Sequence, residues 1–393
     1  MVAIPEMKIC LLMSEVLPVP AVRGGAVETL VMHWLKSQES SRESHEVHIV
    51  SRFERKAQKQ SREFSRTNFH WVRPLPCEPL FKRVWQKFIP RTPFSDIYLK
   101  RGLKKLKKLT FDVVVVENRP EFLERVRRTF PKAKVILHLH NDTLNSETVM
   151  GYEKIQATDK ILCISEFIRN RVLTVPKSSP SKVQVLYNAV DSEQFFYQPQ
   201  RTLEPLNLVF LGRISSFKGA GVFVQAVLQL NTKYPNIHVK FVGSSAYQGS
   251  QKDSYQKMLA QQLSNSRLSV EWTGYVPQAQ LPQQLANASV LVIPSRWQEP
   301  AGLTVLEGMS LGIPVVASRV GGIPEYLTEA EGWLVEFSKK EEEMAQELEK
   351  VLDNVINHYP LALQKAKVAR KKVEQSFSSQ TYWHRFIESL ETA

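Results

Sequence analysis

Two carboxylates, Glu299 and Glu307, flank the predicted start of a helix in the second half of the chain. A buried apolar run ends at Ile293, a loop with two prolines follows, and residues 302–311 show the apolar spacing of a helix. The first backbone N–H groups of a helix attract an anion, and Gly302 lets a ligand approach them closely. Since carboxylates accept hydrogen bonds from hydroxyl groups, this stretch predicts a nucleotide-sugar site. The simpler alternative is a glutamate that only interacts favourably with the helix dipole.

A second candidate phosphate site follows the predicted strand of residues 206–211. Gly212 and Arg213 come directly after this strand, and Lys218 follows before a predicted helix. Two cations at a junction of strand and helix can converge on a diphosphate. Ordinary surface charge is the alternative for each side chain.

The first half of the chain offers a similar junction. An apolar run over residues 7–13 predicts a strand, Gly24 and Gly25 form a loop, and residues 27–35 predict a helix. This order again provides an anion site at a helix start, with a plain tight turn as the alternative. The spacing is not Gly-x-Gly-x-x-Gly, so it does not predict dinucleotide binding.

Two histidines alternate with leucine in residues 135–142, so His138 and His140 project from one face of a predicted strand. His140 lies at the carboxyl end of the strand, where α/β sheets bind ligands, and we expect it to be functional. For His138 a hydrogen-bonded core position is the better interpretation. Ser165 follows another apolar run and is predicted to cap the helix of residues 166–173.

The fold class is predicted to be α/β. Continuous apolar runs recur along the chain with helical patterns between them, which is typical of parallel sheets covered on both faces. A polar segment with prolines at residues 198–205 is the predicted linker. It separates a Rossmann-like domain of residues 1–200 from a second one of residues 201–378.

Several of these motifs, in this order, resemble the retaining glycosyltransferases of family 4, including capsule, exopolysaccharide and spore-coat members. Glu299-Pro-Ala-Gly-Leu-x-x-Leu-Glu307 is similar to the family signature, although Ala301 stands where the family often has Phe. The spacing of Arg213 and Lys218 and the Gly24-Gly25-x-x-Glu28 loop also resemble the family. The resemblance implies the GT-B fold: two Rossmann-like domains that face a cleft, with residues 379–393 forming a helix that returns to the first domain.

The resemblance also implies roles for particular residues. Glu299 would position the donor sugar, Glu307 would hold the ribose, and His140 would act near the reaction centre. Arg213 and Lys218 would neutralise the leaving diphosphate, with retention of the anomeric configuration. Further donor contacts are expected from Gly24, Gly25, Ser165, Gly212, Val276, Ala301, Gly302, Leu303 and Thr304.

Neither a metal nor another cofactor is expected. The sequence contains no Asp-x-Asp, and the two cations with the helix amides can supply the positive potential instead. The expected function is metal-independent transfer from a nucleotide diphosphate sugar, UDP-linked in our prediction, to a glycan or lipid-linked acceptor. The alternatives are a nucleotide-sugar epimerase, a phosphorylase, for which no pyridoxal-binding lysine is evident, and a non-catalytic coat or envelope protein.

The composition points to a cytoplasmic protein. The three cysteines are too few for a disulfide framework. The chain shows neither a signal-peptide pattern nor an apolar run of the roughly 18 residues that would span a bilayer.

The formal charge of +13 is concentrated in the first half, where residues 1–200 carry 33 Lys and Arg against 21 Asp and Glu. Residues 81–109 alone hold ten cations and one acidic residue, around leucines at helical spacing. A core helix with a solvated basic face is the simpler interpretation. The alternative is peripheral contact with an anionic inner membrane leaflet, where lipid-linked acceptors lie. Nothing in the sequence indicates nucleic-acid readout.

Overall fold

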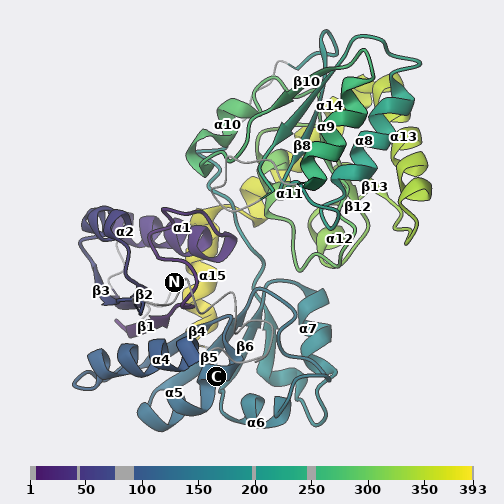
Figure 1. Cartoon of the computed structure of the whole chain (residues 1–393). Helices are drawn as coiled ribbons and strands as arrows, with labels where there is room; N and C mark the ends of the chain where they lie inside the picture. Colours follow the sequence, from purple (N-terminus) through teal and green to yellow (C-terminus); the bar gives the residue numbers. More distant parts are fainter. Residues whose placement is uncertain (1–5, 42–44, 76–92, 197–200, 246–253, 392–393) are drawn as a thin grey trace. The chain divides into compact units, whose positions relative to one another are not determined.

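The computed structural model describes residues 6–41, 45–75, 93–196, 201–245 and 254–391 of the 393-residue chain. The chain divides into two compact units. One consists of Met1–Tyr187 with Tyr382–Ala393, and the other of Asn188–Thr381. Each unit is built on a parallel sheet with helices packed against it (Figure 1). The predicted α/β class with two Rossmann-like domains is therefore confirmed.

The first unit contains, among its described residues, a seven-stranded sheet with the order β3-β2-β1-β4-β5-β6-β7. Leu11 of β1 pairs with Ile49 of β2 and with Val115 of β4, and all the pairings are parallel. The strand order reverses between β1 and β4, and such a switch point is where doubly wound sheets bind ligands. The strands are β1 (Lys8–Leu12), β2 (Glu46–Arg52), β3 (Thr67–Val72), β4 (Val113–Glu117), β5 (Lys134–Leu139), β6 (Lys160–Cys163) and β7 (Val183–Val185).

Helices cover both faces of this sheet, with α1 and α2 on one face and α4 and α5 on the other (Figure 1). The leucine stripe predicted for α4 is correct, since Leu99, Leu103 and Leu106 are buried. Phe81, Trp85 and Phe88 of the predicted basic segment lie outside the described residues. The helices are α1 (Ala26–Ser40), α2 (Arg55–Gln60), α4 (Pro93–Leu106), α5 (Leu123–Thr129), α6 (Gly151–Gln156), α7 (Glu166–Leu173) and α15 (Ser379–Glu391).

The last helix, α15, is packed into the first unit by aromatic rings and by two lysines. Trp383 stacks on Trp34 of α1 with ring centroids 5.2 Å apart. Lys134 donates to the carbonyl oxygen of Leu390 at 2.8 Å, and Lys160 to that of Ser389 at 2.8 Å. Cations at the C-terminal end of a helix satisfy its unpaired carbonyls and complement its dipole. Burial lowers the pKa of Lys160 to about 8, and the neighbouring Lys134 adds to the effect.

The second unit contains, within the described part of the chain, a six-stranded parallel sheet with the order β10-β9-β8-β11-β12-β13. Its order reverses between β8 and β11, which gives this unit a switch point of its own. The strands are β8 (Leu206–Leu211), β9 (Ile237–Val242), β10 (Ser269–Trp272), β11 (Val290–Ile293), β12 (Val315–Ser318) and β13 (Trp333–Val335). The helices are α8 (Ala220–Leu230), α9 (Ser254–Ser264), α10 (Leu281–Gln284), α11 (Leu303–Ser310), α12 (Ile323–Tyr326), α13 (Glu341–Asn357) and α14 (Tyr359–Ser376).

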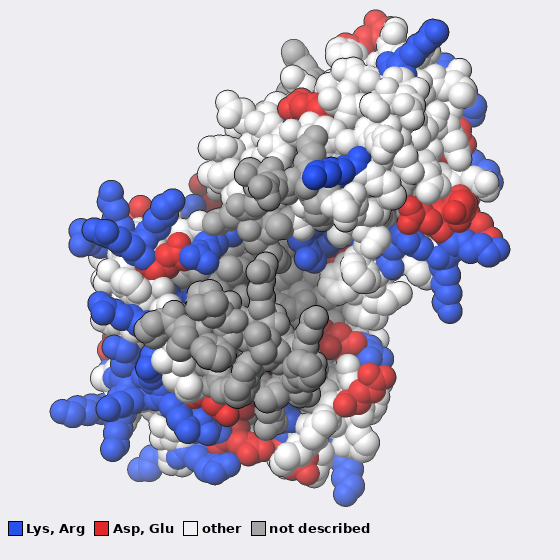
Figure 2. Space-filling model, in the orientation of Figure 1, with Lys and Arg blue, Asp and Glu red and all other residues white. Residues whose placement is uncertain are grey.

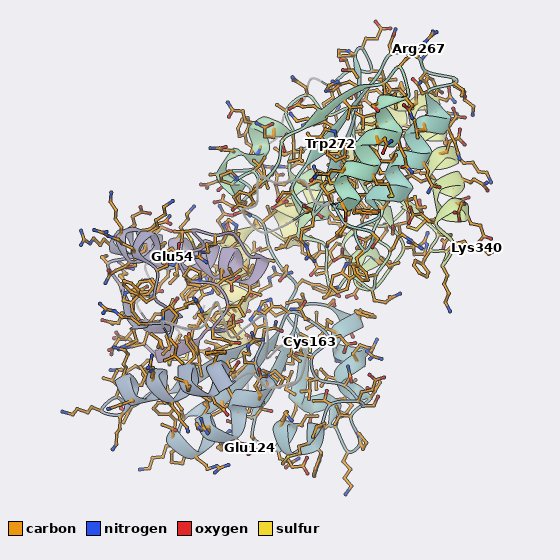
Figure 3. All side chains as sticks on the ribbon, viewed as in Figure 1. Glu54, Glu124, Cys163, Arg267, Trp272 and Lys340 are labelled. Carbon is orange, nitrogen blue, oxygen red and sulfur yellow. The ribbon has the colours of Figure 1, made fainter. Side chains whose placement is uncertain are left out.

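The core of the second unit lies between the sheet and α8, α9 and α13. Phe223 of α8 contacts Phe210 and Phe241, and Trp272 stacks on Phe241 at a centroid distance of 3.9 Å (Trp272 is labelled in Figure 3). This apolar and aromatic layer fixes β8 and β9, whose carboxyl ends carry candidate site residues.

The boundary between the units falls at Tyr187 and Asn188, earlier than the predicted boundary at residue 200. The reason is visible in the contacts of the connecting segment. The backbone N–H of Val190 donates to the carbonyl of Phe377, and buried Phe195 accepts a hydrogen bond from Ser310 through its carbonyl. Arg201, within the predicted linker, is buried and donates to several carbonyls of the second unit. On the C-terminal side, the first unit resumes at Tyr382 rather than at residue 379.

Two of the cysteines, Cys10 and Cys163, are buried free thiols, while Cys77 lies outside the described residues. Cys163 lies on β6 within the first unit (Figure 3). Among the described residues, every helix is too short or too polar to cross a lipid bilayer.

The backbone around Lys218 is closely packed at the neighbouring Gly219, and a substitution there can test this packing. Gly219 has φ +72°, and a Cβ there would lie 1.8 Å from the carbonyl oxygen of Pro294. Gly274 has a similar φ of +70° but no atom within 4 Å of the added Cβ. We expect Gly274→Ala to cost about 1 kcal/mol of unfolding free energy through backbone strain alone. Gly219→Ala should cost roughly 3 kcal/mol or more because backbone must also move.

Urea unfolding of both variants, followed by circular dichroism, gives the comparison. Equal losses for the two glycines would contradict the close approach of Gly219 to Pro294.

Candidate functional site

The candidate residues of the second unit follow the two strands at its switch point. Arg213 and Lys218 come after β8, and Glu299 comes after β11. The carboxyl ends of neighbouring parallel strands meet at one edge of a sheet, so these loops are brought together. The predicted helix after Glu299 is confirmed as α11.

Glu299 is buried and held from several sides. Its Oε1 accepts a hydrogen bond from the hydroxyl of Ser295 at 2.6 Å and forms an ion pair with Lys218. Its carbonyl accepts from the N–H of Gly322 at 2.8 Å. A Cβ on Gly321 would lie 2.0 Å from that carbonyl oxygen, so only glycine fits there. The carboxylate is therefore fixed in place by both backbone and side chains.

Lys218 is the cation that the fold brings to Glu299. Its Nζ also lies 5.4 Å from the centre of the Trp297 ring, a cation–π contact. Arg213 instead lines a cavity of about 170 Å³ together with Gly212, Tyr275 and Val276. The structure thus pairs Lys218 with a carboxylate and places Arg213 in the lining of this cavity, and the predicted convergence of the two cations on a diphosphate stays a prediction.

The N-terminal end of α11 carries no side-chain cap. The N-cap residue is Gly302, and no side chain caps the helix there. The first backbone N–H groups of α11, at Leu303 and Thr304, accordingly have no side-chain acceptor at the N-cap. Ala301 and Gly302 are buried, and a Cβ on Gly302 would lie 2.9 Å from Cγ2 of Val305. A helix start of this kind is suited to an anion, and anion binding here stays a prediction.

Glu307 is buried one turn into α11, which argues against its being a simple surface charge. Gln278 Nε2 donates to its Oε1 at 3.3 Å. Burial raises the pKa of Glu307 to about 7, and the Gln278 hydrogen bond opposes this only in part. A buried carboxyl with a single donor is costly and is a feature of binding sites.

In the first unit, the Gly24-Gly25 loop lies between β1 and α1, again at a switch point. Both glycines have positive φ, and a Cβ on Gly25 would lie 2.2 Å from Oε2 of Glu28. Burial raises the pKa of Glu28 to about 7. Arg23, just before the loop, pairs with Glu54 at 2.6 Å (Glu54 is labelled in Figure 3). The loop is thus closely packed around a buried carboxyl.

His138 on β5 and His140 just after it share one carboxylate, that of Glu117 at the end of β4. His140 Nε2 lies 2.8 Å from its Oε2, and His138 Nδ1 lies 3.1 Å from the same atom. All three side chains are buried. Burial lowers the pKa of His140, so the ring is neutral at pH 7, and the two histidines lower the pKa of Glu117 despite its burial.

Glu117 was not predicted, although a signal existed: it ends the apolar strand β4, which pairs with the strand that carries His138 and leads into His140. The ligating atoms of Glu117, His138 and His140 lie within 4.8 Å of one another, which would suit a metal ion. They already hydrogen bond to each other, so the arrangement also stands without one. Its chemical consequence is that Glu117 orients the His140 ring.

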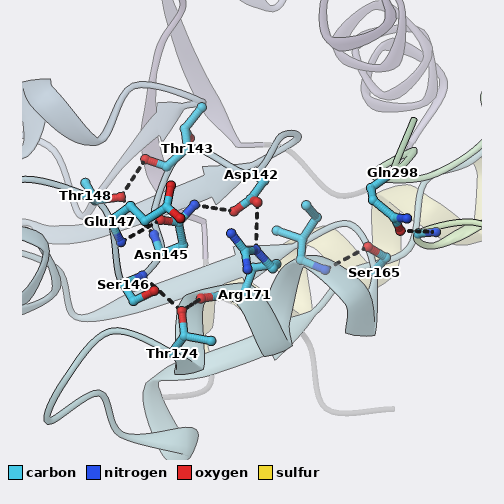
Figure 4. Close-up of polar contacts among 12 residues, drawn as sticks. Asp142, Thr143, Asn145, Ser146, Glu147, Thr148, Ser165, Arg171, Thr174 and Gln298 are labelled. Carbon is cyan, nitrogen blue, oxygen red and sulfur yellow. Dashed lines mark hydrogen bonds and ion pairs between the residues drawn. The ribbon is translucent and has the colours of Figure 1, made fainter. Parts of the chain in front are cut away.

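The segment after His140 is fixed by polar contacts to α7 (Figure 4). Arg171 Nε donates to Asp142 at 2.7 Å, and the N–H of Ser146 donates to the hydroxyl of Thr174 at 2.9 Å. Ser165 caps α7, with its hydroxyl accepting from the N–H of Ile168 at 3.1 Å, as predicted. Ser295 and Gln278 are site residues that the sequence did not reveal.

Comparison with known proteins identifies two glycosyltransferase domains in the chain. The family model described as Glycosyltransferase Family 4 matches residues 25–194, and the model described as Glycosyl transferases group 1 matches residues 191–371. Spore coat protein SA of Bacillus subtilis is 25% identical over 402 residues, covering 98% of each chain. The lipopolysaccharide 1,2-N-acetylglucosaminetransferase of Salmonella typhimurium is 26% identical over 328 residues, covering 79% of this chain and 81% of its own.

The fold also matches solved structures. Anabaena Alr3699/HepE in complex with UDP-glucose has a TM-score of 0.73 at 18% identity, with 99% of this chain and 100% of that chain covered. A Rickettsia africae glycosyltransferase has a TM-score of 0.74 at 17% identity, with 98% of each chain covered. With a family 4 domain followed by a group 1 domain, this chain belongs to the glycosyltransferases of the GT-B fold.

Proposed function

We propose that this glycosyltransferase moves a sugar from a UDP-sugar to a glycan or lipid-linked acceptor, with retention of configuration and without a metal ion. The observation that carries the proposal is the arrangement around α11: the Lys218–Glu299 pair, the open helix start at Gly302 and the buried Glu307. The complex of Alr3699/HepE with UDP-glucose supports the choice of base.

The three parts of the donor, which are the ribose, the diphosphate and the sugar, can each be assigned to residues around α11. Glu307 accepts hydrogen bonds from the ribose, the amides of Leu303 and Thr304 face the diphosphate, and Glu299 accepts from the hydroxyls of the sugar. Lys218 reaches the Glu299 carboxylate, so it stands where sugar and diphosphate meet. A donor phosphate would share this cation with Glu299.

The chemical step needs positive charge at the leaving diphosphate. Arg213, Lys218 and the α11 amides supply a fixed potential for the charge that develops as the bond to the sugar breaks. Retention is consistent with attack from the same face as departure, with the leaving phosphate taking the acceptor proton. His140 of the first unit is neutral and oriented by Glu117, so its role in the reaction would be that of a hydrogen-bond donor or acceptor rather than a cation.

A second candidate is a coat protein that keeps the fold without catalysis, and the similarity to spore coat protein SA favours it. The fixed Glu299 and the buried Glu307 favour the enzyme, because buried carboxyls are costly to maintain without a ligand to bind. Release of UDP from UDP-sugars in water distinguishes the two.

We also propose that the basic face of α4 touches an anionic membrane from the cytoplasmic side. Lys100, Lys104, Lys107 and Lys108 are exposed while the leucine stripe is buried. Each cation near an anionic surface contributes about 1 kcal/mol. Such attachment is peripheral and reversible.

The diphosphate assignment is tested with Arg213→Ala and Lys218→Ala. Loss of one charged transition-state contact costs on the order of 3 kcal/mol, so each variant should turn over UDP-sugar roughly a hundredfold more slowly. Lys240→Ala is the matched control, because Lys240 pairs with Glu271 at 3.2 Å on the sheet of the same unit. The absence of a metal requirement is tested on the parent protein, which should keep its rate of UDP-sugar turnover in EDTA. Loss of activity in EDTA that Mg²⁺ restores would overturn the metal-free mechanism.

The roles of the two carboxyls are distinguished with the variants Glu307→Gln and Glu299→Gln. The affinity of each variant for free UDP is measured by calorimetry. Glu307→Gln should weaken UDP binding because an amide is a poorer acceptor for ribose hydroxyls, whereas Glu299→Gln should weaken only the sugar-bearing donor. Ribose binding favours the ionised form of a carboxyl whose pKa is about 7. Affinity for UDP should therefore rise from about pH 6 to about pH 8, and less steeply in Glu307→Gln. Equal UDP affinities of the two variants would contradict this division.

Membrane contact is tested by co-sedimentation with phosphatidylglycerol vesicles. Binding is expected at low salt and should disappear near roughly 1 M salt, where the Debye length falls to about 3 Å. Charge reversal at Lys104, Lys105, Lys107 and Lys108 should also abolish it. No sedimentation of the parent at low salt would refute the contact.

A further inference from the structure

Partly exposed aromatic rings gather at the edge of the first sheet. β3 is the edge strand, and its Phe69 and Trp71 stack with ring centroids 5.4 Å apart. Phe53, which follows β2, meets Trp71 edge to face at 6.3 Å. These three rings are only partly buried, whereas large aromatic side chains usually contribute to a core. A contiguous cluster of exposed apolar side chains is typical of a binding surface.

Cations surround the same rings. Arg73 lies over the Phe53 ring, 5.2 Å from its centre. Arg101, Lys104 and Lys105 of α4 line a cavity of about 690 Å³ together with Phe53, Trp71 and Arg73. Figure 2 shows Lys and Arg gathering on the face of the first unit that carries α4. No acidic residue is among the described side chains that line this cavity, and no described acidic side chain pairs with Lys104 or Lys105.

Flat rings beside cations that pair with no acidic side chain in the described part of the chain indicate a particular ligand chemistry. An aromatic face stacks on the C–H face of a pyranose ring, and Lys and Arg bind carboxylates. A cavity of this size accommodates a few sugar units rather than a metal ion or a single phosphate. A membrane surface needs only the exposed lysines, whereas the rings of Phe53 and Trp71 in the cavity lining suit a ligand that stacks on them.

We propose that this pocket, lined by Phe53, Trp71, Arg73, Arg101, Lys104 and Lys105, binds a segment of a glycan that carries carboxylates. The inference rests on the proposed function and deepens it, because it assigns the acceptor to the uronic-acid-containing glycans. The pocket holds part of the acceptor chain away from its reacting end. It acts as a positioning site and contacts none of the reacting atoms.

Two matched variants separate this pocket from general electrostatics. Lys104→Glu/Lys105→Glu reverses two charges that line the pocket, while Lys107→Glu/Lys108→Glu makes the same changes just past the end of α4, outside the lining. All four lysines are exposed, so both variants should fold, as thermal melts can check. Trp71→Ala removes the stacking surface as a third, independent change.

Binding of octagalacturonate is measured by calorimetry, with maltooctaose as the uncharged chain of equal length. The parent should bind octagalacturonate and not maltooctaose. Lys104→Glu/Lys105→Glu and Trp71→Ala should each weaken binding roughly tenfold or more, as expected for losing charge-assisted contacts or a stacked ring. Lys107→Glu/Lys108→Glu should bind within about twofold of the parent.

Three results would overturn the proposal: equal losses in the two lysine variants, equal binding of maltooctaose, or displacement of octagalacturonate by a lower concentration of octathymidylate. The last would identify a single-stranded nucleic-acid surface, whose stacking rings and cations are similar. A parent that sediments with anionic vesicles but does not bind octagalacturonate would also refute it, and would leave a membrane face alone. Release of UDP from UDP-glucose in water is measured on the same samples. It tests the proposed catalytic function independently of glycan binding by the pocket.

Discussion

The second unit depends on one ion pair, between Lys218 after β8 and Glu299 after β11. The two residues are 81 positions apart, yet they meet because the sheet places β8 beside β11 at the point where the strand order reverses. Removing both charges from water is costly, so the backbone must hold them in place. Gly219 against Pro294 and Gly321 against Glu299 provide this support, since neither contact leaves room for a Cβ.

The two units repeat this logic with different side chains. In each, a carboxyl near the start of a helix is buried deeply enough for its pKa to rise to about 7: Glu28 in α1 and Glu307 in α11. Each unit also holds a further buried carboxylate by side-chain partners: two histidines contact Glu117 at the end of β4, and a lysine contacts Glu299 in the loop between β11 and α11. A Rossmann-like unit thus places protonatable groups at its switch point, and the identity of the partners decides what they bind.

The sequence predicted most of the fold because it is carried by local patterns: continuous apolar strands, glycines before helices, and the Ser165 cap. Candidate site residues could be proposed from sequence where one segment contains both carboxylates and a helix start, as in residues 299–307. Ser295, Gln278 and Glu117 were missed because their importance arises from contacts between strands that are distant in sequence. The unit boundary was placed too late for the same reason, since Arg201 and Phe195 are fixed by carbonyl and hydroxyl groups far along the chain.

The lysines that hold the end of α15 have a consequence for how the chain is assembled. Lys134 and Lys160 belong to the middle of the first unit, whereas the carbonyls they bind belong to Ser389 and Leu390, at the end of the chain. The second unit is continuous in sequence and so is complete before the first. Until residues 379–391 have been made, Trp34 lacks its stacking partner Trp383, and Lys134 and Lys160 lack the carbonyls of Leu390 and Ser389. Packing of α15 onto the first unit closes a chain loop that contains the whole second unit. The first unit therefore gains these contacts only after the second unit has been made.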